Sequence, residues 1–460
     1  MNERLQNYQI NTKDSLKFAV FSFLGVFLFL VPIPTGGAFN IPIGLLVNRV
    51  SDFINFLGAR GGFNLAAVLV LVFLTLSVIG TVLAHTVKPD FLMKDEKVRD
   101  VFLSTPIYTV SRIVGMVFVY MIFFQVGPEP IIAEHTGEVI LGLGAALVSI
   151  FLVLAFAMPL LTDFGIMEFV GILIRKAVRF LFTVPGRSSI DLMASWFGSS
   201  ALAVLLTRGQ QERGFYTGRE AAAICVNFSV VSVPFSFVVA RTVGLESHFV
   251  IWYIIITITC MLLAVIMPRI WPLSKLPDEY LKETGKQIDE NIPENVSSLK
   301  WAVTLAGERA SRSSAKDVAR TGLHCYLNVF MDLIPLILAW GTIAVILVEF
   351  TPIFNVISLP MGWFMSLFGI EGAMAIAHTT LIGFIDMYLP ALMLGEAAIE
   401  TRFIVSALSI VQIIYMAETG ILILKSHIPL KLWHLMVIFM MRTLFAIPVI
   451  TLLTRLFVNL

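Results

Sequence analysis

Polar side chains inside apolar segments are the residues of this sequence with the most evident chemistry. Ser229, Ser232 and Ser236 follow one another at i, i+3 and i+7, a spacing that predicts one shared helix face. Asn227 precedes them and offers an amide that both donates and accepts hydrogen bonds. Within apolar segments such groups face a cavity or one another. Asn227, Ser229 and Ser232 are therefore candidate contacts of a polar ligand. Serine also mediates helix packing, so both interpretations stay open.

A second, looser polar stripe lies nearer the C-terminus. Ser409, Gln412 and Tyr415 form it, with Glu418 and Thr419 one turn further on. Gln412 and Tyr415 are candidate ligand contacts, although glutamine too can serve helix packing. Glu418 is ionisable, and we expect it to take part in ion coupling.

One apolar stretch, residues 190–207, is too rich in small and polar residues for an ordinary lipid-facing helix. Its Gly198, Ser199 and Ser200 are expected to form the tip of a broken helix. Free backbone N–H groups at such a tip suit a charged or polar ligand, whereas the alternative is a tight packing turn.

A similar stretch covers residues 369–394. It contains Asp386, and Pro390 follows as a helix breaker. Asp386 can bind a sodium ion or a proton, or it can cap a helix near the outer surface. Broken helices are tolerated at membrane depth only where protein or water surrounds them. Both stretches are therefore predicted to be re-entrant hairpins.

The composition requires a bilayer around these segments. Of 460 residues, 58% are hydrophobic and 14% are charged, against roughly 25% charged in an average soluble protein. The net charge of +1 argues against nucleic acid as a partner. Runs of about 20 apolar residues, the length that spans a bilayer, recur about nine times. These runs cover residues 16–34, 63–85, 105–126, 139–161, 221–240, 249–267, 323–348, 403–424 and 432–457. The sequence therefore predicts an all-α, polytopic membrane protein.

Charge placement orients the segments, because short cytoplasmic loops are enriched in Lys and Arg. The loop after the second run is basic and lies inside, with Lys88, Lys94, Lys97 and Arg99. Basic residues flank the first hairpin on both sides, namely Arg175, Lys176, Arg179, Arg187, Arg208, Arg213 and Arg219. No Lys or Arg occurs between Tyr326 and Thr401, where the acidic residues are Asp332, Glu349, Glu371, Asp386, Glu396 and Glu400. The two hairpins therefore enter from opposite faces, the first from inside.

These features predict four parts in the chain. Residues 1–145 form N-terminal spans, and residues 146–268 form a first repeat with its hairpin at about 188–207. Residues 269–322 form a charged cytoplasmic linker, with Asp278, Glu279, Lys282, Glu283 and Lys286. Residues 323–460 form a second repeat with its hairpin at about 370–395. Inverted repeats with broken helices are a transporter design. The linker is expected to be solvated, with a regulatory module as the alternative.

Two blocks of the sequence resemble a known family. Residues 185–232, PGRSSIDLMASWFGSSALAVLLTRGQQERGFYTGREAAAICVNFSVVS, resemble the nucleoside recognition GATE domain of YjiH-type membrane proteins. Residues 383–420, GFIDMYLPALMLGEAAIETRFIVSALSIVQIIYMAETG, resemble that family's second half. The resemblance implies kinship with concentrative nucleoside transporters and with the GATE region of ferrous-iron permeases. In the nucleoside carriers, substrate and a coupling cation bind between the hairpin tips and the spans that follow.

The expected function is secondary active transport of a small polar metabolite, namely a nucleoside, an amino acid or peptide, or an organic acid. The sequence contains no nucleotide-binding motif, so sodium or protons are the expected coupling ions, with no other cofactor. No metal-ligand spacing or nucleophile–base arrangement occurs, so we expect no metal site and no enzyme. The alternative is a non-transporting sensor or assembly scaffold with the same ligand pocket. We expect the bacterial inner membrane, an N-terminus inside, and a homo-oligomer by analogy with carriers of the related fold.

Overall fold

The computed structural model describes residues 12–35, 38–94, 99, 101–103, 106–281, 296–395 and 397–458. Five residues of the charge pattern lie outside the described residues, namely Lys97, Lys282, Glu283, Lys286 and Glu396. The described chain is predominantly helical and divides into two compact units. Unit 1 comprises residues 1–42, 158–315 and 358–460, and unit 2 comprises residues 43–157 and 316–357.

Six helical stretches of the described chain are long and apolar enough to cross a bilayer. They are Leu65–Thr86, Glu129–Thr162, Glu246–Lys275, Lys316–Phe350, Ile399–Leu424 and Leu432–Phe457. A seventh crossing results if the bent pair Gly218–Phe228 and Val233–Thr242, which meet at 40°, counts as one span. The predicted polytopic helical membrane protein is confirmed. Of the nine expected windows, residues 16–34 and 105–126 correspond to shorter or more charged helices outside those six.

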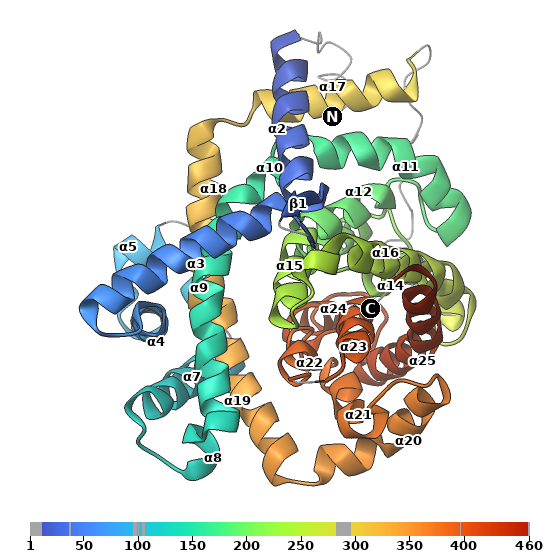
Figure 1. The fold of residues 1–460 in the computed structure, drawn as a ribbon. Coiled ribbons are helices and arrows are strands. Elements are labelled where there is room, and N and C mark those ends of the chain that lie inside the picture. The colour runs from blue at the N-terminus through green and yellow to red at the C-terminus, as the bar shows by residue number, and fades with distance from the viewer. Residues whose placement is uncertain are drawn as a thin grey trace. The chain divides into compact units, whose positions relative to one another are not determined.

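Unit 1 contains both polar stripes and both predicted hairpins. Its α-helices are α2 (Thr12–Leu30), α10 (Pro159–Thr162), α11 (Ile166–Phe182), α12 (Ser188–Met193), α13 (Ser200–Glu212), α14 (Gly218–Phe228), α15 (Val233–Thr242), α16 (Phe249–Ile266), α17 (Ser298–Ser311), α21 (Ala373–Ile382), α22 (Leu389–Leu392), α23 (Ile399–Val411), α24 (Ile421–Leu424) and α25 (Leu432–Phe457). Short π- and 3₁₀-turns join them: η2 (Ala194–Gly198), η3 (Glu246–His248), η4 (Met267–Arg269), η5 (Leu273–Lys275) and η7 (Met416–Gly420). Helices α16, α23 and α25 pack together around its core (Figure 1).

A short β-ribbon is a small departure from the expected all-α class. Strands β1 (Ile33–Thr35) and β2 (Ala38–Asn40) pair antiparallel, with Ile33 opposite Asn40.

Unit 2 is built around four packed helices, α4, α7, α9 and α19 (Figure 1). Its elements are α3 (Pro42–Gly61), α4 (Leu65–Thr86), α5 (Asp90–Met93), α7 (Pro106–Phe124), α8 (Glu129–Ile132), η1 (Glu134–Glu138), α9 (Val139–Ala157), α18 (Ala315–Asn328), η6 (Val329–Leu333) and α19 (Ile334–Phe350). Gly115 allows α7 and α19 to approach closely, because a Cβ there would lie 2.5 Å from the Pro335 carbonyl oxygen. Helix α20 (Ile353–Leu367) leads from unit 2 into unit 1.

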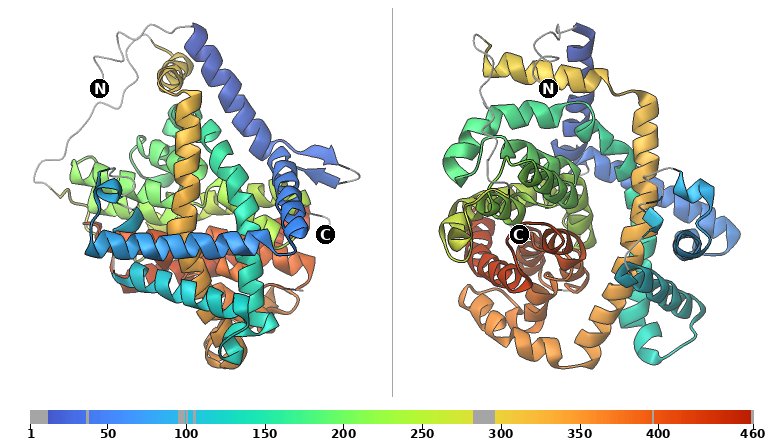
Figure 2. Two further views of the ribbon diagram at one scale, coloured as in Figure 1. Left: turned by 90° about the vertical axis from the view of Figure 1, so that its left-hand side faces the viewer. Right: turned by 180° about the vertical axis from the view of Figure 1, so that it is seen from behind.

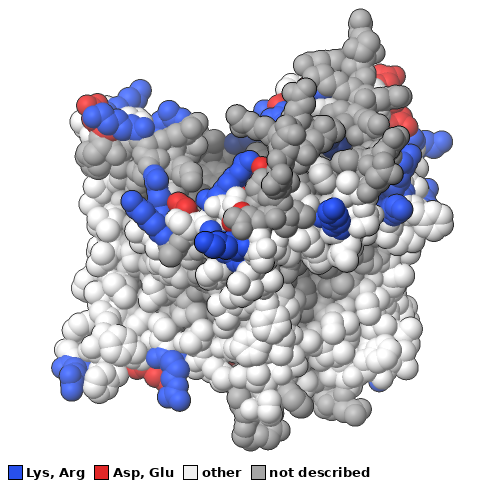
Figure 3. All heavy atoms as spheres, turned by 90° about the horizontal axis from the view of Figure 1, so that it is seen from above, with Lys and Arg blue, Asp and Glu red and all other residues white. Residues whose placement is uncertain are grey.

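Charge is unevenly distributed on the described surface. On the face shown in Figure 3, Lys and Arg side chains are gathered in a few groups, and much of the remaining described surface is uncharged. Large apolar side chains are exposed, among them Phe23, Ile79, Val110, Trp363 and Leu452. Exposed apolar surface of this extent requires a lipid environment.

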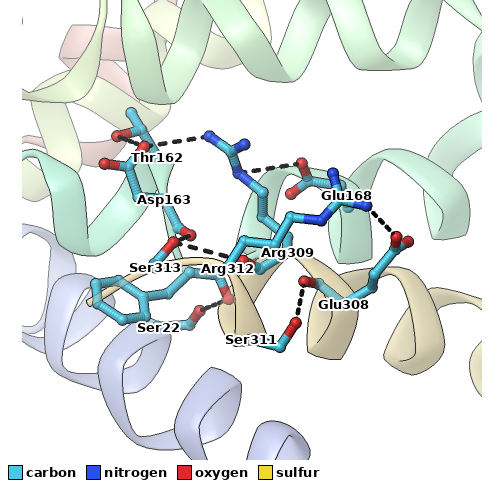
Figure 4. Close-up of polar contacts among 10 residues, drawn as sticks. Ser22, Thr162, Asp163, Glu168, Glu308, Arg309, Ser311, Arg312 and Ser313 are labelled. Atoms are coloured by element: carbon cyan, nitrogen blue, oxygen red, sulfur yellow. Dashed lines mark hydrogen bonds and ion pairs between the residues drawn. The ribbon is translucent and has the colours of Figure 1, made fainter. Parts of the chain in front are cut away.

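Helix α17, from the charged segment, packs against α2 and α11 (Figure 2). Small residues form its buried face, namely Ala302, Ala306, Gly307 and Ala310. Polar contacts hold its C-terminal end, as Figure 4 shows. Arg309 lies 3.3 Å from the Asp163 carboxylate and 3.9 Å from the Glu168 carboxylate, and the Ser313 hydroxyl donates to the Asp163 carbonyl at 2.6 Å.

Gly165 permits this close packing. Its φ of +97° is a conformation that L side chains rarely adopt, and a Cβ there would lie 2.7 Å from the Ala306 Cα. Glycine at this position therefore serves both the backbone turn into α11 and the approach of α17.

Replacing Gly165 tests this docking. We expect Gly165→Ala to destabilise the protein by about 2 kcal/mol or more, because strain and overlap with the backbone of α17 combine. The midpoint of thermal unfolding in detergent measures this loss. The matched control is Gly209→Ala inside α13, where a Cβ would meet nothing within 4 Å. Equal midpoints for the two variants would contradict the docked position of α17.

Candidate functional site

Two helices of unit 1 break part-way along their length. Helix α14 ends at Phe228, residues 229–232 are not helical, and α15 begins at Val233. Pro234 lies in the first turn of α15, where its missing N–H is tolerated, whereas inside a continuous helix it would remove the hydrogen bond to the carbonyl of residue 230. Ser229 and Ser232 thus belong to an unwound segment. The prediction that Ser229, Ser232 and Ser236 share one face of a continuous helix is wrong for this reason.

The second break follows α23. That helix ends at Val411, and regular structure resumes at Met416 after an unwound stretch that contains Gln412 and Tyr415. Ile413 has a φ of +64°, an unfavourable conformation for a β-branched residue. Such strain persists only where the surroundings impose it, and it is concentrated at functional sites. Gln412 and Tyr415 of the second polar stripe therefore also lie in a break, whereas Ser409 lies in α23 and Glu418 in η7.

One buried arginine joins the two breaks. Arg442 of α25 is fully buried, and its Nε and Nη2 donate to the Val411 carbonyl at 3.1 and 2.8 Å. Its Nη1 donates to the Val226 carbonyl at 3.1 Å and to Asn227 Oδ1 at 2.8 Å. The C-terminal ends of α14 and α23 therefore lie within the reach of a single guanidinium group.

The first predicted hairpin consists of α12, η2 and α13, interrupted at Ser199. Ser199 has an extended backbone and caps α13, its hydroxyl accepting from the Leu202 N–H at 3.1 Å. Asp191 joins the two arms, because its carboxylate accepts from the Thr207 hydroxyl at 3.2 Å and from the Tyr216 hydroxyl at 2.9 Å. The Ser195 hydroxyl donates to a carbonyl of the first break, that of Val230.

Glu418 reaches the interrupted point of this hairpin. Its carboxylate accepts from the Ala201 N–H at 3.2 Å and from the Ser200 hydroxyl. Ser200 is buried, whereas Ser199 and Glu418 are partly accessible. An acidic group is stabilised at a helix N-terminus, here that of α13. Two predicted site residues from distant parts of the sequence, Ser200 and Glu418, are thus in direct contact.

The second predicted hairpin lies next to the second break. The carbonyls of Phe384 and Ile385 accept from the N–H groups of Met416 and Ala417 at 2.9 and 3.0 Å. Asp386 is buried, and it accepts from the N–H groups of Tyr388, at 2.8 Å, and of Leu389. In this structure Asp386 therefore caps the start of α22.

These contacts link four chain segments, and Arg442 binds two of them directly. We name this region the helix-break junction, and it comprises residues 198–201, 226–232, 384–386 and 411–418 together with Arg442. Within the described residues, no three His, Cys, Asp or Glu side chains form a group that could hold a metal ion.

Both breaks contain a buried polar atom without a hydrogen-bond partner. They are Ser229 Oγ and Gln412 Oε1, each on a residue 1% exposed. Gln412 is otherwise fixed, because its Nε2 donates to the Thr380 carbonyl at 2.8 Å and to the Thr443 hydroxyl at 2.9 Å. Buried polar atoms are nearly always paired, so each break offers an atom that could hydrogen-bond to a water molecule or a ligand.

The remaining predicted residues have structural contacts. The Tyr415 hydroxyl donates to the carbonyls of Ser409 and Ile410 at 3.0 and 2.7 Å, and so satisfies carbonyls in the last turn of α23. Asn227 donates to the Ala223 carbonyl at 2.8 Å. Ser232 stands at the N-cap of α15, and its side chain makes no capping hydrogen bond. Of these three residues, Ser232 has the side chain least committed to a neighbour.

Sequence reasoning missed two residues of this region, Arg442 and Asp191. Both could have been identified from the sequence, because burying an ionisable side chain in an apolar segment is unfavourable in free energy and such residues are candidates for functional sites. Arg442 lies in the middle of the last apolar run, and Asp191 lies inside the first predicted hairpin.

Gly383 provides a test of the position of Gln412. A Cβ at Gly383 would overlap Gln412 Oε1. We therefore expect Gly383→Ala to lower the thermal unfolding midpoint, with a cost of about 1–3 kcal/mol from overpacking. The double variant with Gln412→Ala should be no less stable than Gln412→Ala alone, because the overlapping group is gone. Additive losses in this double-mutant cycle would contradict the contact.

Comparisons with known proteins place the chain in a family. The Gate model, described as nucleoside recognition, matches residues 145–246, which contain the first hairpin and the first break. An uncharacterized protein of Alkalihalophilus pseudofirmus is 41% identical over 451 residues, covering 97% of this chain and 96% of that protein. Among solved structures, the chain is similar to a double variant of CNTnw in an outward-facing state, with a TM-score of 0.43 and 14% identity over 97% of this chain and 98% of that one. The predicted resemblance is confirmed, and the chain belongs to a family of membrane proteins with a Gate nucleoside recognition domain.

Proposed function

We propose that this protein is a secondary active transporter of a small polar metabolite, working by alternating access around the two hairpins. The observation that carries the proposal is the helix-break junction. Two interrupted helices and two hairpin segments meet there, and each break holds a buried acceptor without a partner. Discontinuous helices with a site between them are typical of secondary transporters.

Nucleosides are the first substrate class to consider. The matched Gate model bears the description nucleoside recognition, and its residues 145–246 include Asn227, Ser229 and Ser232. A nucleoside offers hydroxyl and amino groups that could donate to the unpartnered Ser229 Oγ and Gln412 Oε1. Amino acids or peptides and organic acids are the other classes that polar hairpin ends would suit.

Glu418 is the proposed coupling residue, with Asp386 as the second candidate. Glu418 is partly accessible and contacts the interrupted point of the first hairpin through Ser200 and Ala201. Loss of its charge, or neutralisation by a cation, would weaken its hold on the N-terminus of α13. That change would link ion binding to movement of the hairpin.

The proposed setting is the inner membrane of a bacterium. The basic residues that flank the first hairpin support a cytoplasmic location for that side of the chain, and for the N-terminus, by the positive-inside rule. We further propose that the protein assembles as a homo-oligomer, as carriers of related fold do.

A binding screen followed by an uptake assay tests the function. Purified protein is heated with uridine, adenosine, amino acids, dipeptides or dicarboxylates, and a ligand is recognised by a raised unfolding midpoint. The ligand found is then supplied in labelled form to proteoliposomes under a sodium gradient, a pH gradient or neither. We expect accumulation above the outside concentration under one gradient.

Other outcomes of this assay separate the alternatives. A ligand that binds and does not enter the vesicles would contradict transport and favour a sensor or scaffold. Entry without accumulation under either gradient would remove ion coupling.

Substitution of Glu418 tests its role. We expect Glu418→Gln to reduce gradient-driven accumulation by about tenfold or more, because the amide oxygen still accepts the Ala201 N–H and the charge is lost. The control is Glu400→Gln, which removes an exposed carboxylate that pairs with Arg455 at 2.6 Å. Full accumulation by Glu418→Gln would exclude this carboxylate as the coupling group.

A further inference from the structure

Arg442 is a buried cation with an unusual set of partners. It lies in the middle of α25 with no exposed surface. Among the ion pairs of the described residues, none includes Arg442. Its guanidinium group donates to the backbone carbonyls of Val226 and Val411 and to the Asn227 side-chain oxygen. Burying a charge in such a place has a large desolvation free energy unless the surrounding groups stabilise the charge.

Helix ends provide this compensation. The last carbonyls of a helix have no partner within the helix, and together they carry a partial negative charge. The Val226 carbonyl belongs to the last turn of α14, and the Val411 carbonyl ends α23. Because two helix C-termini converge on the guanidinium, their combined field stabilises a cation there without an acidic side chain.

Most of the N–H donors of Arg442 are already hydrogen-bonded within the protein. Its Nε and Nη2 form a fork on one carbonyl, and Nη1 serves two further acceptors. Four of the five N–H donors are therefore used by the protein itself. A residue so engaged is unsuited to bind an anionic substrate directly.

In secondary transporters, unwound carbonyls and the C-terminal ends of broken helices coordinate the coupling cation. We propose that Arg442 is a tethered cation: its guanidinium permanently occupies the position between the two broken helices that a free sodium ion would otherwise fill. Removing the side chain then creates a cation site from the vacated oxygens. That the displaced cation would be the coupling ion rests on the proposed transport function, whereas the position of the Arg442 guanidinium between the two broken helices does not.

A stability assay tests the proposal without any substrate. Wild-type protein and Arg442→Ala are purified, and their unfolding midpoints are measured in sodium, guanidinium or choline chloride at equal, low ionic strength. We expect Arg442→Ala to be less stable than the wild type. Sodium and guanidinium should each raise its midpoint by several degrees relative to choline, because an ion that binds only the folded state stabilises it. The wild-type midpoint should not distinguish the three cations.

Arg402→Ala is the matched control. Arg402 donates from Nη1 to the carbonyl of Val243 at the end of α15, at 2.9 Å, and it is only part-buried. We expect a small loss of stability and no preference among cations. The same cation preference in this variant would show a general effect of arginine removal, and would overturn the proposal.

Two further results decide the case. If Arg442→Ala yields no folded protein in choline chloride, folded Arg442→Ala or Arg442→Gln that can be purified only when guanidinium is present would support the tethered cation. If no cation stabilises or recovers either variant, or if sodium stabilises the wild type as much as the variant, the proposal is wrong. Because unfolding is the readout, a failure of transport leaves these results unaffected.

Discussion

A helix that breaks inside an apolar environment exposes backbone groups that have no water to bind, and this constraint governs unit 1. The structure meets it with protein groups. Arg442 satisfies the ends of α14 and α23, the Ser195 hydroxyl bonds the first break, and the second hairpin supplies carbonyls to the second break. Satisfying these groups draws four segments into one place. The helix-break junction is thus a consequence of breaking two helices in lipid.

Much of this arrangement could be predicted from local chemistry. Small and polar residues in the apolar stretch 190–207 indicated an interrupted helix, and the interruption occurs at Ser199. The break after Phe228 was not predicted, because residues 221–240 were expected to form one continuous span. The helical-face argument failed for Ser229 and Ser232 because regular periodicity assumes an intact helix, whereas this one unwinds at those residues. The left-handed backbone of Ile413 could not be predicted, since a β-branched residue disfavours it and only tertiary packing imposes it.

Contacts between distant segments were the least predictable part of the site. Glu418 was identified as ionisable, but its position against Ser200 and Ala201 depends on how distant segments of unit 1 fold together. Packing of α17 likewise depends on Gly165, whose role is evident only when the backbone of Ala306 lies against it. The sequence could indicate which residues were unusual for a lipid environment, and the fold determines which of them meet.

We expect the transported molecule to bind at the helix-break junction. An experimental structure with the ligand selected by thermal stabilisation tests it most directly. The account predicts ligand density within hydrogen-bonding distance of Ser229 Oγ and Gln412 Oε1, the unpaired buried atom of each helix break. Ligand density elsewhere, with both acceptors still unpaired, would contradict it.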